Sequence, residues 1–66
     1  MTPIDDPRPI RDVLADFKAR HGLTYEGLAA RTGRGRSTLA RALDGAGIGN
    51  EREFRALLTL IDEGRA

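Results

Sequence analysis

Basic side chains gather in the middle of this 66-residue chain. Between positions 18 and 41, six basic residues stand against one acid, Glu26, whereas the rest of the chain carries five basic and nine acidic residues. The six are Lys18, Arg20, Arg31, Arg34, Arg36 and Arg41. Guanidinium groups pair with phosphate oxygens and, through two parallel hydrogen bonds, with the acceptors on the edge of guanine. The middle of the chain is therefore predicted to bind a polyanion, although the net charge of the whole chain is only +1.

Two short helical patterns, separated by a glycine-containing break, must position these arginines. Less polar residues recur at helical spacing on both sides of the break. They are Tyr25, Leu28, Ala29 and Thr32 before it and Leu39, Ala42 and Leu43 after it. At the break, Gly33 supplies the left-handed backbone conformation with which helices commonly end. Two helices joined by such a tight turn predict a helix-turn-helix over residues 23–43.

This segment resembles the helix-turn-helix of the lambda repressor and Cro superfamily, often called the XRE family. The matching positions are Ala29, Gly33, Leu39, Leu43 and the exit Asp44-Gly45. Two positions depart from the family pattern. Gly27 lies inside the first helix of the pair, where it costs about 1 kcal/mol relative to alanine, and Thr32 occupies a position that is usually apolar. The resemblance implies a DNA-binding regulator.

Two further helical patterns flank the pair and are expected to support it. The first begins between Pro7 and Pro9, with Asp6 as its cap, and runs to about Arg20. The last spans about 51–63 and is capped by a box of Asn50 and Glu53. The predicted fold is thus all-α, a small bundle of four short helices in one domain over residues 1–66, with residues 1–7 as a flexible N-terminal segment. Its expected core centre is Leu14, Phe17, Leu28, Leu39, Leu43, Phe54, Leu57 and Ile61.

The helix after Gly33, about residues 35–44, is expected to carry recognition. Its outward and N-terminal positions can reach base edges, and their arginines favour a half-site containing guanine. These base-contacting candidates are Arg36, Ser37, Thr38 and Arg41. Tyr25, Arg31 and Arg34 are the candidates for phosphate contact. The resemblance gives Arg36 and Ser37 the leading base-contact positions and brings Tyr25 near the phosphate backbone, whereas the residues alone fit Tyr25 equally well at the edge of the core.

The last helix has a wider apolar arc than one packing partner requires. Leu58 and Leu60 are therefore candidates for the interface of a homodimer, although Leu60 alone fits a singly exposed leucine nearly as well. With this dimer, the sequence predicts a small bacterial or phage repressor that occludes a promoter by binding an operator in double-stranded DNA. The alternative is a protein-interaction module, antitoxin-like or an anti-repressor partner, on the same scaffold. RNA binding is a weaker third reading.

The sequence offers few residues that would support catalysis, metal binding or membrane insertion. The chain has no cysteine, one histidine, His21, and no apolar run near the roughly 20 residues that span a bilayer. Asp12 and Asp16 share a helix face without a partner base or nucleophile, so no catalytic residue, metal ligand or cofactor is predicted. We also expect no membrane or small-molecule partner. The expected location is the cytoplasm, in association with the nucleoid.

Overall fold

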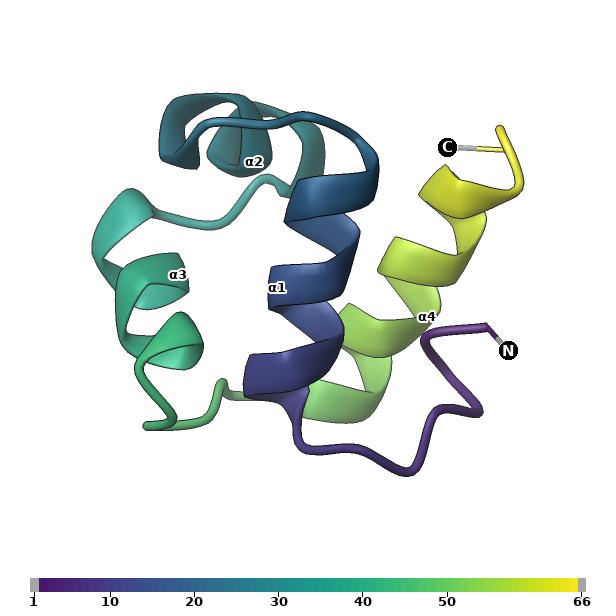
Figure 1. Cartoon of the computed structure of the whole chain (residues 1–66), viewed down its shortest axis with the longest axis horizontal. Coiled ribbons are helices and arrows are strands. Elements are labelled where there is room, and N and C mark those ends of the chain that lie inside the picture. Colours follow the sequence, from purple (N-terminus) through teal and green to yellow (C-terminus); the bar gives the residue numbers. More distant parts are fainter. Residues whose placement is uncertain (1, 66) are drawn as a thin grey trace.

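Four helices follow one another along the chain in the computed structural model, which describes residues 2–65. They are α1 (Ile10–Arg20), α2 (Tyr25–Thr32), α3 (Arg36–Leu43) and α4 (Glu51–Asp62). No strand occurs within the described range, so the predicted all-α class is confirmed. Both α1 and α2 pack against α3 and against α4. In Figure 1, α3 and α4 lie at opposite sides of the molecule.

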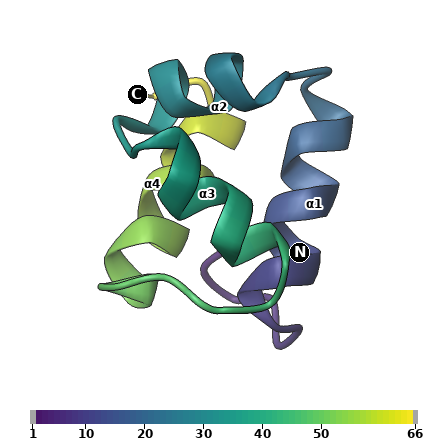
Figure 2. The ribbon, with the colours of Figure 1, turned by 90° about the vertical axis from the view of Figure 1, so that its left-hand side faces the viewer.

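The corner between α2 and α3 forms as its residues predict. Thr24 caps α2, because its Oγ1 accepts a hydrogen bond from the backbone N–H of Gly27 at 3.1 Å. Gly33 ends the helix with a φ of +72° and donates its N–H to Ala29. The hydroxyl of Thr32 is buried but donates to the carbonyl of Leu28 at 2.8 Å, so a polar residue is satisfied at this inward position. Figure 2 shows α2 crossing above α3 at this corner.

The core is built around two phenylalanines, Phe17 and Phe54, that are fully buried. The other buried apolar residues are Ile10, Val13, Leu14, Leu28, Leu39, Ala42, Leu58 and Ile61. Leu43 and Leu57 were expected at its centre but are only partly buried and pack at its edge. The reason on α4 is rotation: its buried stripe follows Phe54, Leu58 and Ile61, at i, i+4 and i+7, which leaves Leu57 beside it.

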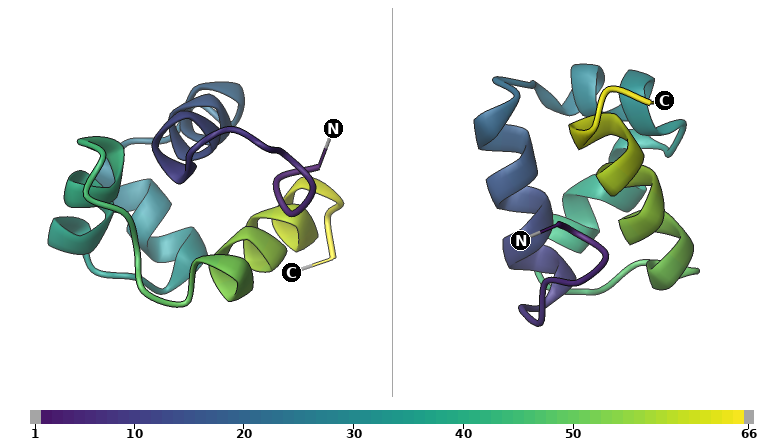
Figure 3. Two further views of the ribbon diagram at one scale, coloured as in Figure 1. Left: turned by 90° about the horizontal axis from the view of Figure 1, so that it is seen from below. Right: turned by 90° about the vertical axis from the view of Figure 1, so that its right-hand side faces the viewer.

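The N-terminal segment differs from the flexible arm expected over residues 1–7. Residues 2–9 lie along α4, on the side of the molecule opposite α3 (Figure 3). Pro3 is buried, and the backbone N–H of Ile4 donates to Thr59 Oγ1 at 3.0 Å. Met1 lies outside the described residues. Sequence periodicity does not reveal this packing, because the segment is irregular and is held through its backbone.

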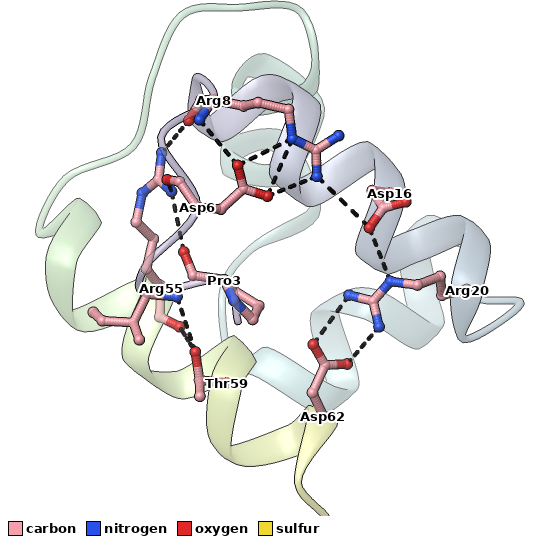
Figure 4. Close-up of polar contacts among 9 residues, drawn as sticks. Pro3, Asp6, Arg8, Asp16, Arg20, Arg55, Thr59 and Asp62 are labelled. Atoms are coloured by element: carbon pink, nitrogen blue, oxygen red, sulfur yellow. Dashed lines mark hydrogen bonds and ion pairs between the residues drawn. The ribbon is translucent and has the colours of Figure 1, made fainter. Parts of the chain in front are cut away.

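Arg55 of α4 holds this segment in place. Its guanidinium donates to three backbone carbonyls, those of Pro3 at 3.1 Å, Asp6 at 2.8 Å and Arg8 at 2.7 Å. It also pairs with the carboxylate of Glu51 at 3.0 Å, one turn earlier on α4. The side chain is nearly buried, and it lies among the three segment residues whose carbonyls accept its hydrogen bonds (Figure 4).

Two expected helix caps are absent. Asp6 does not cap α1; its carboxylate binds the backbone N–H and the guanidinium of Arg8, and Pro9 precedes the helix without a side-chain bond. Asn50 and Glu53 do not form a capping box on α4 either. Asn50 has a φ of +53°, at the end of a loop with two further left-handed residues, Gly45 and Gly47. This left-handed backbone replaces the extended conformation that a capping side chain requires.

A chain of ion pairs joins α1 to the end of α4. Arg20 reaches Asp16 at 2.9 Å and binds Asp62 through both terminal nitrogens at 3.0 Å (Figure 4). His21, at the C-cap of α1, places Nε2 2.6 Å from the Asp62 carboxylate. The sequence placed His21 at the end of α1, and the structure adds this partner from α4.

Stability is expected to fall in acid through Asp62. The hydrogen bonds from Arg20 lower the pKa of this carboxyl below its ordinary value, because they favour the ionised form. A carboxyl with a lowered folded-state pKa stabilises the fold above its unfolded value of about 4, and this contribution is lost as the pH falls through the folded-state pKa. Asp62→Asn is therefore expected to unfold more easily at pH 7 and to lose less further stability between pH 5 and pH 3.

Thermal unfolding followed by circular dichroism at several pH values measures this difference. Asp44→Asn is the control, since Asp44 is exposed and makes no ion pair within residues 2–65. Parallel pH profiles for wild type and Asp62→Asn would contradict the role of Asp62.

Candidate nucleic-acid interface

The outer face of α3 carries most of the predicted base-contacting residues. Leu39 and Ala42 turn inward and are fully buried, which fixes the rotation of the helix. Arg36, Ser37 and Arg41 are exposed on the other side. No other helix covers this face, which is directed at the viewer in Figure 2. The helix is thus held by its apolar side and presents two guanidinium groups and a hydroxyl to the solvent.

Two shallow hollows flank α3 and divide the predicted residues between them. The first, about 410 Å³, is lined by Tyr25, Arg36, Ser37 and Ala40, and so joins the start of α2 to the start of α3. The second, about 240 Å³, lies between Thr38 and Arg41 on α3 and the loop of residues 46–49. Thr38 is half-buried there, so it is less open than the other three base-contacting candidates.

Tyr25 faces solvent instead of completing the core. Its side chain is 44% exposed, and the ammonium group of Lys18 lies 5.2 Å from the centre of its ring. Tyr25 is therefore accessible to a ligand at this surface. The structure also places Lys18, from the last turn of α1, beside Tyr25. The position of Lys18 in the basic middle of the chain was the only sequence signal for this.

Arg31 and Arg34 are placed differently from the α3 arginines. Arg31 is exposed in the last turn of α2. Arg34 is half-buried in the turn, with its guanidinium carbon 5.7 Å from the centre of the Phe54 ring. Neither side chain lines the hollow beside Arg36. The structure thus brings Tyr25 together with the base-contacting candidates Arg36 and Ser37. Arg31 and Arg34 lie outside this group.

Sequence reasoning missed two features of this surface. The loop of residues 46–49, to which the sequence assigned no function, forms one wall of the hollow beside Arg41. Glu26, in the first turn of α2, pairs with Arg36 at 3.4 Å. The first could have been inferred from the glycines of this loop, which let a ligand approach the backbone closely. For the pairing of Glu26 with Arg36, the only signal in the sequence was that Glu26 is the single acid in a basic stretch.

The two residues of α4 that were predicted to form a dimer interface differ in their exposure to solvent. Leu58 is fully buried in the core, so its prediction as an interface residue is wrong: its side chain is one of the residues that fix α4 to the domain. Leu60 is 37% exposed. Near it on α4, an open hollow of about 580 Å³ is lined by Ile4, Asn50, Arg52, Glu53 and Ala56.

Residues 2–65 contain neither a cluster of metal-binding side chains nor a helix that could span a membrane. No group of three or more histidine, cysteine, aspartate or glutamate side chains there could hold a metal ion. None of the four helices is long and apolar enough to span a membrane.

Helix α3 follows α2 after a turn that begins at the left-handed Gly33, and it is held to the domain by its apolar face. Its outer face is open. This arrangement defines a helix-turn-helix domain. Residues 10–66 match a protein family described as "Helix-turn-helix domain". The chain belongs to this family. Membership supports DNA binding. No match was found among curated proteins or among solved structures.

Proposed function

We propose that this domain is a sequence-specific regulator of transcription, similar to the lambda repressor and Cro (XRE) superfamily. In this proposal it is a small bacterial or phage repressor that acts on the nucleoid in the cytoplasm. It binds an operator as a dimer and occludes the promoter. The supporting observation is the outer face of α3, where Arg36, Ser37 and Arg41 are exposed on a helix whose opposite side is fully buried.

Base reading is assigned to α3. Arg36 and Arg41 carry the donors that pair with O6 and N7 of guanine, and Ser37 and Thr38 add hydroxyl groups. Because Arg36 and Arg41 belong to the hollows on the two sides of the helix, they are proposed to read different base pairs of one half-site. An α-helix fits the major groove with this face toward the bases.

Phosphate contacts are assigned to the surroundings of α3. Tyr25 offers a hydroxyl beside Arg36, and Arg31 and Arg34 offer charge at the periphery. The loop of residues 46–49 can approach a phosphate closely near Arg41, since two of its four residues are glycine. Such contacts set affinity and its salt dependence, whereas the α3 side chains set sequence preference.

Binding to the DNA upstream of the protein's own gene, compared with an unrelated duplex over a salt series, tests this function. The expected result is tighter binding to the upstream DNA at one two-fold-symmetric site, weakening as salt rises. Light scattering on the same samples gives the mass of the protein alone and on DNA. Weak and equal binding to both duplexes would contradict the proposal.

Leu60 is proposed to lie in the dimer interface. Leu60→Glu is expected to weaken self-association by at least about tenfold, because it removes apolar burial from both copies and adds two charges. The fold itself should persist, since Leu60 is exposed in the single chain. Ala15→Glu introduces the same charge at an exposed position of α1 and is the matched control. Sedimentation of the three proteins at equal concentration measures the effect, and equal masses throughout would exclude Leu60 from an interface.

A second candidate function uses the same α4 surface. Leu60 and the hollow beside Ile4 and Ala56 also suit a different protein, which would make the domain an antitoxin-like or anti-repressor module. The two functions separate by substitution: Leu60→Glu should abolish binding of a protein partner, whereas Arg36→Ala with Arg41→Ala should leave it intact.

A further inference from the structure

Glu26 is the one carboxylate in the basic middle of the chain, and it lies on the surface assigned to DNA. It belongs to the first turn of α2, where a negative charge also suits the helix N-terminus. Its Oε1 is 3.4 Å from Nη1 of Arg36, so the pair links the start of α2 to the start of α3. Both side chains face solvent, with Glu26 76% and Arg36 65% exposed.

Folding stability does not account for the ion pair between Glu26 and Arg36, beyond what the charge of Glu26 contributes at the N-terminus of α2. Ion pairs as exposed as this one contribute little to stability, because water and salt screen them and two long side chains lose freedom. On a surface that approaches phosphates, a carboxylate also opposes binding. The pair therefore lowers the general attraction to DNA at the position where the base-reading helix begins.

The geometry gives the pair a different use. Glu26 binds Nη1 of Arg36, and the remaining edge of the guanidinium, formed by Nε and Nη2, is not engaged by Glu26. This edge carries two parallel N–H donors, the arrangement that matches O6 and N7 of guanine. An arginine held in advance also loses less side-chain freedom on binding than one that moves freely.

We propose that Glu26 is a positioning residue, which holds Arg36 for guanine and withholds it from phosphates. The inference rests on the proposed function, because it assigns Arg36 to base reading. Glu26 then raises the ratio of specific to non-specific affinity while lowering affinity for DNA in general. Arg41 has no such carboxylate among residues 2–65, so this restraint acts at the Arg36 end of α3.

The test compares Glu26→Gln with Glu53→Gln. Glutamine keeps the size and an acceptor oxygen but removes the charge. Glu53 is an exposed acid in the first turn of α4, so its substitution removes the same charge from an equivalent helical position elsewhere. Wild type is first used to select binding sites from random duplexes. Affinities are then measured on the selected duplex, on the same duplex with each guanine replaced in turn, and on an unselected duplex, over a salt series.

For Glu26→Gln we expect about three- to tenfold tighter binding to the unselected duplex, and a salt dependence steeper by about one phosphate contact. At one guanine of the site, discrimination should fall by about tenfold. Glu53→Gln should leave these quantities unchanged. In an Arg36→Ala background, Glu26→Gln should no longer affect discrimination at that guanine.

Three results would overturn the inference. Unchanged discrimination in Glu26→Gln would show that Glu26 does not position Arg36. If Glu26→Gln and Glu53→Gln raised the affinity for the unselected duplex equally, Glu26 would act only through its negative charge and not by positioning Arg36. If wild type selected no site at all, the proposed function would fail first and the inference with it, so the two failures are distinguishable.

Discussion

Arg36→Ala combined with Arg41→Ala is expected to weaken binding to a selected DNA site by at least about 30-fold. Each arginine that pairs with guanine through two hydrogen bonds contributes about 1–3 kcal/mol, and the two residues lie in different hollows beside α3. The fold should be unaffected, since both side chains are exposed and the inward residues of α3 are untouched. Fluorescence anisotropy of a labelled duplex measures the affinity, and circular dichroism verifies the fold.

The control for this variant removes the same charge elsewhere. Arg52→Ala with Arg65→Ala deletes two exposed arginines from α4 and the chain end that follows it, on the side of the molecule opposite α3 (Figure 1). A small and sequence-independent loss is expected, because only the general attraction to DNA falls. If the two double variants weakened binding equally, α3 would have no special role in recognition.

Arg55→Met is expected to lower the free energy of unfolding by about 3 kcal/mol. Methionine retains much of the aliphatic stem but removes the guanidinium, and three backbone carbonyls then lose their donor. Loss of one partner from a buried charged network commonly costs 3–5 kcal/mol, roughly. A single domain of this size has a total stability of only about 3–5 kcal/mol, so the variant should be largely unfolded near body temperature. Urea unfolding followed by circular dichroism measures the difference.

Two comparisons distinguish this mechanism from a general effect of losing an arginine. Arg52→Met changes an exposed arginine one turn earlier on α4 and should alter stability little. Deletion of residues 1–8 should destabilise wild type strongly but add less to Arg55→Met, because the side chain and the segment stabilise each other. Strictly additive losses would contradict the assigned role of Arg55.

The helices were predictable because each has a strong apolar period. On α1, Ile10, Val13, Leu14 and Phe17 all became core residues, and Gly33 ended α2 in the left-handed conformation it was expected to adopt. Thr24, of a residue type that favours helix N-caps, caps α2. These are local effects of side-chain spacing and backbone freedom, which a sequence displays directly.

The predictions that failed depend on structure outside the helix concerned. Arg55 lies outside the apolar pattern of α4, yet it is nearly buried because carbonyls about 50 positions earlier in the chain accept its hydrogen bonds. Leu58 was assigned to a surface because the rotation of α4 could not be fixed by its own wide apolar arc. Asn50 does not cap α4 because its backbone, at the end of the preceding glycine-containing loop, has a left-handed conformation.

The candidate site was partly predictable for the same reasons. Arg36, Ser37 and Arg41 were placed outward because Leu39 and Ala42 define the inward side of α3. The contacts of Tyr25 with its surroundings depend on the angle between helices, and the pairing of Glu26 with Arg36 depends on the turn between them. Neither angle follows from the spacing of residues along one helix.

The most direct test of the central assignment, that the outer face of α3 contacts DNA, is a titration of isotope-labelled protein with the selected duplex followed by NMR. The account predicts that amide shifts concentrate in residues 36–41, at Tyr25 and in the loop of residues 46–49, and that the exposed side of α4 around Leu60 changes little at constant oligomeric state. Shifts confined to α4 and the N-terminal segment, with α3 unaffected, would contradict it.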